Sequence, residues 1–77
     1  MATVGDWIHI GGDAWERYGT GTHYTVHGHN GQWVARGFLL DDQGTAHHEV
    51  EEPAQTLEDA KQIADQWESK QSLRETR

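Results

Sequence analysis

The stretch that decides the fold is residues 22–50, THYTVHGHNGQWVARGFLLDDQGTAHHEV, and its centre is the dipeptide Asn30-Gly31. Asn-Gly between two runs rich in β-branched and aromatic residues is the strongest short-range signal for a β-hairpin, because a type I′ turn requires a positive φ at both central residues. The sequence therefore predicts two antiparallel strands that are joined at this turn.

The register of this hairpin divides its side chains into two faces. A two-residue loop places Gly28 opposite Trp33 and Tyr24 opposite Gly37, so each large ring lies across from bare backbone. The apolar face, which we expect to be the core, carries Tyr24, Val26, Gly28, Trp33, Ala35, Gly37 and Leu39. The outer face carries His23, Thr25, His27, His29, Gln32, Val34, Arg36 and Phe38.

A polar turn, DDQG, leads into a third run at residues 45–50. With Leu40 opposite Thr45, Glu49 lies across from Arg36, a pair that stabilises a sheet by roughly 0.2–1 kcal/mol. In this register the residues that join the core face are Ala46, His48 and Val50, and those that join the outer face are His47, Glu49 and Glu51. The registers set by the two turns place the apolar side chains on the same face. This agreement predicts a three-stranded meander.

The first part of the chain is apolar, and residues 3–10 are a candidate fourth strand that ends at a Gly-Gly-Asp break. Residues 14–18 fit either a strand or a helical turn, and a Gly-Thr-Gly loop follows. We expect Trp7, Ile8 and Trp15 to pack onto the domain or a partner. Because a meander leaves unpaired edges, either residues 3–10 cover one edge or two chains pair into a homodimer.

A C-terminal helix closes the predicted domain. Pro53 ends the strand region, since it lacks the backbone donor of a ladder, and Thr56 is a good helix N-cap. The apolar stripe at helical spacing consists of Leu57, Ala60, Ile63, Ala64 and Trp67. The acidic residues that we expect to point away from the sheet are Glu58, Asp59, Asp65 and Glu68. The fold class is therefore α+β: a three-stranded antiparallel β-meander, with a fourth strand as an alternative, packed against one C-terminal α-helix. Residues 1–70 form one domain, and residues 71–77 are a polar tail.

Composition limits the classes of function. The chain has 77 residues, no cysteine and a formal net charge of −7. Thiolate metal sites are excluded, and the negative charge disfavours a nucleic-acid backbone as partner. No apolar run approaches the ~20 residues of a membrane span, and no charged-then-apolar leader opens the chain. A soluble, cytoplasmic protein without a cofactor is the expectation.

Candidate catalytic and metal-binding residues form no recognisable motif. The sequence has no Gly-x-Ser-x-Gly and no phosphate loop, so we expect no enzyme activity. Six histidines are many for this length. Those that are candidates for a zinc or nickel site are His23, His27, His29 and His47. Opposing a metal site, no His-x-x-x-His helix is present, so solvated strand histidines are the simpler interpretation.

A family resemblance rests on two motifs, Gly-Gln-Trp-Val-Ala at residues 31–35 and Thr-Leu-Glu-Asp-Ala-Lys at residues 56–61. Over roughly residues 22–68 the chain resembles AP2-type DNA-binding domains and the arm-binding N-terminal domains of tyrosine integrases. It also looks like small uncharacterised phage and bacterial proteins of that shape. The resemblance implies three strands with a packed helix, and it implies duplex binding by a basic sheet face. Here the outer face offers only Arg36.

The function that the sequence favours is a small acidic, non-enzymatic protein-interaction module, such as a phage or mobile-element accessory protein that modulates a host factor. In its extreme form it is a DNA mimic, whose carboxylates occupy a basic nucleic-acid site. The alternatives are an AP2-like nucleic-acid-binding domain and a histidine-based metal-binding protein. The candidate interaction residues are Trp7, Trp15, Phe38, Arg36, Glu49, Glu51 and Glu52.

Overall fold

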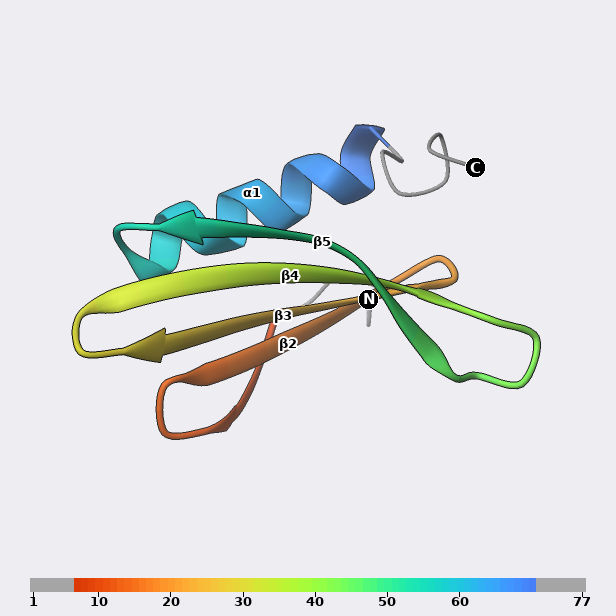
Figure 1. Ribbon diagram of the computed structural model, residues 1–77, viewed down its shortest axis with the longest axis horizontal. Helices are drawn as coiled ribbons and strands as arrows, with labels where there is room; N and C mark the ends of the chain where they lie inside the picture. Colours follow the sequence, from red (N-terminus) through yellow and green to blue (C-terminus); the bar gives the residue numbers. More distant parts are fainter. Residues whose placement is uncertain (1–6, 71–77) are drawn as a thin grey trace.

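The computed structural model describes residues 7–70, which form one antiparallel sheet and one helix (Figure 1). The elements are β1 (Ile8–Gly11), β2 (Ala14–Gly19), β3 (Thr22–His29), β4 (Gln32–Leu40), β5 (Ala46–Ala54) and α1 (Leu57–Lys70). The strands lie side by side in the order β1-β2-β3-β4-β5. The predicted α+β class is thus confirmed, whereas the sheet has five strands rather than three or four.

The central hairpin of β3 and β4 has the predicted geometry. Asn30 and Gly31 both have positive φ, 53° and 80°, as a type I′ turn requires. The register places Tyr24 opposite Gly37 and Gly28 opposite Trp33. A Cβ atom at Gly28 would lie 2.8 Å from the indole of Trp33, so the ring occupies the space that a side chain would need. The turn type and the register of this hairpin are therefore the predicted ones.

Two further strands precede it. The Gly-Gly-Asp break turns out to be a hairpin turn, because Gly11 and Gly12 adopt positive φ and let β1 fold back on β2. The sequence of residues 14–18 fits either a strand or a helical turn. In the structure these residues belong to β2, which pairs with β3 along its whole length. The candidate strand at residues 3–10 is confirmed only in its last part, as β1, and it pairs with β2 rather than with the meander, whose edge at β3 is covered by β2. Residues 3–6 lie outside the described part of the chain.

The pairing of β4 with β5 differs from the prediction. Leu40 lies opposite Ala46, not Thr45, and Phe38 therefore lies opposite His48. His48 and Ala46 are on the outer face and His47 is on the side of Leu39, so the predicted faces of these three residues are wrong. A bulge then leaves Glu49 as an extra residue and puts Arg36 opposite Glu51.

The bulge also restores the apolar face further along β5. Val50 lies opposite Gly37 and packs against the core, as predicted. The strand continues through Pro53 to Ala54, which corrects the expectation that Pro53 ends it. Proline is tolerated there because β5 is an edge strand, where one side of the backbone has no strand partner.

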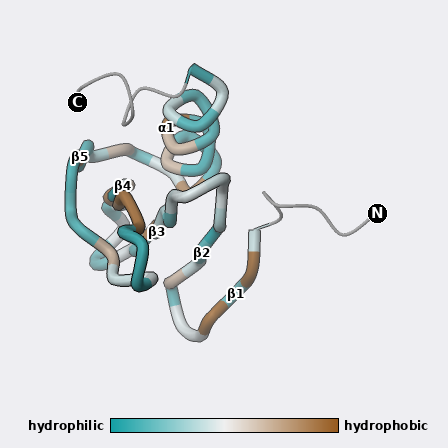
Figure 2. Tube along the Cα trace, turned by 90° about the vertical axis from the view of Figure 1, so that its right-hand side faces the viewer, coloured by the Kyte–Doolittle hydropathy of each residue, from teal (hydrophilic) through white to brown (hydrophobic). Residues whose placement is uncertain are grey.

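The helix α1 covers one side of the sheet (Figure 2). Thr56 caps it as predicted, since its hydroxyl accepts a hydrogen bond of 3.0 Å from the backbone N–H of Asp59. Ala60 and Ala64 are fully buried against the strands, and Trp67 packs beside them while remaining partly exposed. The buried apolar residues of the described chain are Tyr24, Val26, Ala35, Ala60 and Ala64. Within residues 7–70, no helix covers the opposite side, which we call the open face.

Candidate functional site

Four rings cross the open face from strand to strand. Tyr18 of β2, His23 of β3, Phe38 of β4 and His48 of β5 lie opposite one another in register. The ring centroids are 4.3 Å apart for Tyr18 and His23, 5.9 Å for His23 and Phe38, and 5.4 Å for Phe38 and His48. We call this set the aromatic row. It forms a continuous ring surface across four strands.

A second row of side chains runs beside the aromatic row, and we call its charged members, Glu16, Arg36 and Glu51, the polar row. Arg36 Nε lies 3.1 Å from the carboxylate of Glu51, and His48 approaches the same carboxylate at 3.6 Å. On the other flank, His23 Nε2 contacts Glu16 at 3.1 Å. Glu16 therefore positions His23 of the aromatic row through a hydrogen bond, and Glu51 gives Arg36 a partner within the sheet.

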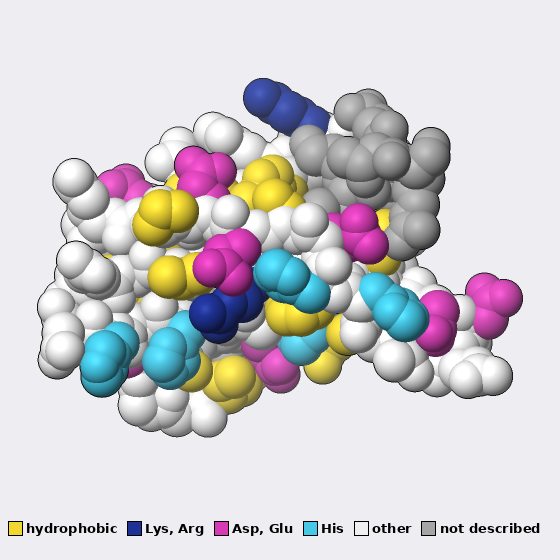
Figure 3. Space-filling model, in the orientation of Figure 1, with side chains coloured by type: hydrophobic (Ala, Val, Ile, Leu, Met, Phe, Trp, Pro, Cys, Tyr) yellow, Lys and Arg dark blue, Asp and Glu magenta, His cyan; other side chains and the backbone are white. Residues whose placement is uncertain are grey.

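The open face also has apolar residues near β1. Ile8 lies opposite Glu16, and both Ile8 and Ile10 leave half of their surface exposed. Tyr18 of the aromatic row is 45% exposed. Figure 3, in which β5 lies at the front, shows histidine, hydrophobic and acidic side chains intermixed on the visible face. The face is therefore mixed rather than basic.

The predicted interaction residues divide between the two sides of the sheet. Phe38, Arg36 and Glu51 lie together on the open face. Glu49 is the exposed bulge residue, and the exposed Glu52 lies opposite the buried Ala35. Trp7 and Trp15 are on the helix side, where they pack against the core. Sequence reasoning placed His23 on the outer face but missed Tyr18 and His48 as its neighbours in one row.

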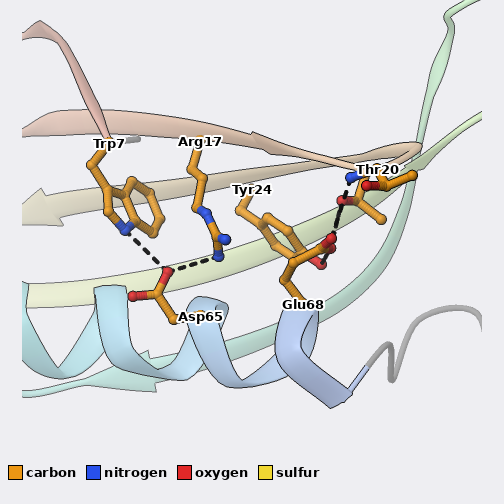
Figure 4. Close-up of polar contacts among 7 residues, drawn as sticks. Trp7, Arg17, Thr20, Tyr24, Asp65 and Glu68 are labelled. Carbon is orange, nitrogen blue, oxygen red and sulfur yellow. Dashed lines mark hydrogen bonds and ion pairs between the residues drawn. The ribbon is translucent and has the colours of Figure 1, made fainter. Parts of the chain in front are cut away.

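The helix side contains a polar cluster that the helical wheel did not predict (Figure 4). Asp65 faces the sheet, where it accepts a hydrogen bond of 2.7 Å from Arg17 and one of 3.2 Å from the indole of Trp7. The expectation that Asp65 points away from the sheet is therefore wrong. Arg17 is largely buried, and this ion pair compensates for its burial.

Glu68 also faces the sheet rather than solvent. Its carboxylate accepts hydrogen bonds from the hydroxyl groups of Tyr24 at 2.7 Å and Thr22 at 2.8 Å, and from the backbone N–H of Thr20 at 3.2 Å. Burial, followed by the hydrogen bond to Glu68 and the negative charge of that carboxylate, raises the pKa of Tyr24 to about 12. A side chain at Gly19 would collide with this carboxylate, so the glycine makes room for it. The cluster fastens the helix to the loop between β2 and β3.

The candidate metal ligands lie apart. His23 contacts Glu16, and His47 contacts Asp41 at 2.8 Å in the turn before β5. His27 and His29 are exposed on β3. Across residues 7–70, no group of three or more histidine, cysteine or acidic residues is arranged to hold a metal ion.

Two grooves meet at the end of β5. One of about 470 Å³ is lined by Trp33 and its neighbours in the central hairpin, and one of about 310 Å³ lies between β5 and α1. Both are large enough for a small ligand. The only ionisable side chain among their lining residues is Asp59, and the other polar side chains are amides. Among the residues that the structure describes, the lining therefore contains no pair of titratable groups for acid–base chemistry.

No protein-family model, curated protein or solved structure matches this chain. The resemblance to AP2-type domains therefore stays a prediction. No helix in the described residues is long and apolar enough to cross a membrane.

Proposed function

We propose that this chain is a small acidic, non-enzymatic protein-interaction module whose contact surface is the open face of the sheet. The observation that supports the proposal is the aromatic row, in which four rings line up across β2 to β5 on the side without a helix. Aromatic side chains contribute a large contact area at little entropic cost, and they are enriched where proteins bind one another. The polar row then forms the rim of the contact.

Charge favours a protein partner over duplex DNA. Of the basic residues in the described chain, Arg36 lies on the open face and is paired with Glu51, while Arg17 is paired with Asp65 on the helix side. Duplex binding requires Lys and Arg side chains that can neutralise phosphates. The AP2-like alternative would therefore have to work through a face on which the one arginine already has a carboxylate partner.

Site-specific photocrosslinking tests the proposal. Benzoylphenylalanine in place of Phe38 samples the open face, and the same group in place of Gln62, which is exposed on α1, is the matched control. We expect a discrete crosslinked polypeptide from position 38 and none from position 62. An excess of unlabelled wild-type protein should suppress the product, whereas Phe38→Ala protein should suppress it less.

Binding to duplex DNA is the result that would contradict this proposal. Fluorescence anisotropy with random-sequence duplex at pH 7.5 should show no binding at physiological salt. Submicromolar binding that weakens steeply with salt, together with no crosslink from position 38, would replace this proposal with the AP2-like one.

A further inference from the structure

The ammonium group of Lys61 lies against the faces of two tryptophans on the helix side. Its Nζ atom is 3.9 Å from the ring centroid of Trp15 and 6.0 Å from that of Trp7. Indole is the best side chain for holding a cation over its face. The two rings therefore form a cation site that a side chain of this same protein fills.

The two rings are held by contacts that do not involve Lys61. The indole N–H of Trp7 donates to Asp65, which is itself fixed by Arg17 (Figure 4). The ring of Trp15 also contacts that of His9, its neighbour across the strands, with 4.7 Å between the centroids. Both indoles also pack against the buried core cluster. The walls of the site should therefore keep their positions when the ammonium group leaves.

Within residues 7–70, the indole rings, rather than a carboxylate, hold the ammonium group of Lys61. This lysine is partly exposed on α1, and the described residues give its ammonium group no carboxylate partner in an ion pair. A primary ammonium is compact and strongly hydrated, so moving it over an indole costs hydration. A quaternary ammonium lacks N–H donors and is a form that aromatic cages bind. Such a cation should replace the lysine.

We propose that Trp7 and Trp15 form a binding site for a quaternary ammonium group of the trimethylammonium type, and that Lys61 is its internal competitor. The site is on the helix side of the sheet, so it is independent of the open face and of the proposed protein contact. Removing the lysine charge should open the site, whereas removing a charge elsewhere on the helix should not.

The test is an NMR titration of the indole N–H signals with choline at constant ionic strength. The neutral control ligand is 3,3-dimethylbutanol, which has the shape of choline without its charge. The variant is Lys61→Met, which keeps an unbranched apolar side chain but removes the ammonium group, and its matched control is Lys70→Met in the last turn of α1. We expect choline to shift the signals of Trp7 and Trp15, with a Kd about tenfold lower in Lys61→Met than in the wild type or in Lys70→Met.

Two results would overturn the proposal. One is an equal response to 3,3-dimethylbutanol, which would show apolar contact without a cation site. The other is the absence of any choline response in a Lys61→Met protein whose amide spectrum remains folded. Trp15→Phe, which keeps a weaker ring in place, should raise the Kd for choline. Phosphocholine and N-acetyl-trimethyllysine amide, titrated separately, then distinguish a lipid head group from a modified lysine as the source of the cation.

Discussion

Glu68 is the residue that connects the helix most directly to the sheet. Two of its donors, the hydroxyl groups of Tyr24 and Thr22, belong to side chains that are 1% exposed. Glu68→Ala leaves those donors without this acceptor, and we expect the free energy of unfolding to fall by about 2–3 kcal/mol. Urea unfolding measures the change. Gln66→Ala, at an exposed position two residues earlier, should cost less than about 0.5 kcal/mol. Equal losses in both variants would contradict the role of Glu68.

Tyr24 makes the same cluster sensitive to alkaline pH. Its pKa is raised from 10.0 to about 12 in the folded protein, so the unfolded chain loses the proton first. The stabilisation is therefore complete below pH 10 and is lost as the pH rises through about 12, a total of roughly 2–3 kcal/mol. The chain has two tyrosines, so Tyr18→Phe leaves Tyr24 as the only phenol for titration at 295 nm. Titration of that phenol near pH 10 in the folded protein would refute the assignment.

The sequence could not reveal these contacts at the scale of single residues. On a helical wheel, Asp65 and Glu68 fall outside the apolar stripe, so they were expected to face solvent. The sheet changes their environment, because Arg17 of β2 donates a hydrogen bond to Asp65 and Tyr24 of β3 donates one to Glu68. Those donors come from strands more than 40 positions away in the chain. The pattern of the helix alone contains no information about them.

At the scale of elements, locality separates the correct predictions from the wrong ones. The hairpin at Asn30 is set by backbone requirements of two residues, and its register was predicted correctly. The loop before β5 depends on a side chain, because Asp41 accepts hydrogen bonds of 2.9 Å from the backbone N–H groups of Gln43 and Thr45. It therefore closes one residue later than predicted, and His48 moves to the open face. The aromatic row could not be assembled from the sequence for this reason.

The loop before β5 should respond to loss of the Asp41 side chain. The pKa of the Asp41 carboxyl lies below its usual 3.8. The largest cause is its hydrogen bond with His47, and the hydrogen bonds from the backbone lower the pKa further. A lowered carboxyl pKa stabilises the fold above about pH 4, and the effect is lost as the pH falls through the lowered value. We expect Asp41→Ala to speed hydrogen exchange at the amides of Gln43 and Thr45 at neutral pH. Asp42→Ala is the control, and the same acceleration in both variants would argue against this description of the turn.

At the scale of the whole molecule, net charge sets the tendency to associate. The formal charge is −7 with neutral histidines, and protonating all six gives −7 + 6 = −1. Charge repulsion between copies should therefore almost vanish as the pH falls from about 8 to about 5, and exposed apolar side chains such as Ile8 and Ile10 would then meet little opposition. We expect static light scattering to rise over this range. Replacing the exposed His27 and His29 with glutamine leaves four histidines and a charge of −7 + 4 = −3, so scattering should rise less. A flat signal for the wild type would show that charge does not keep the copies apart.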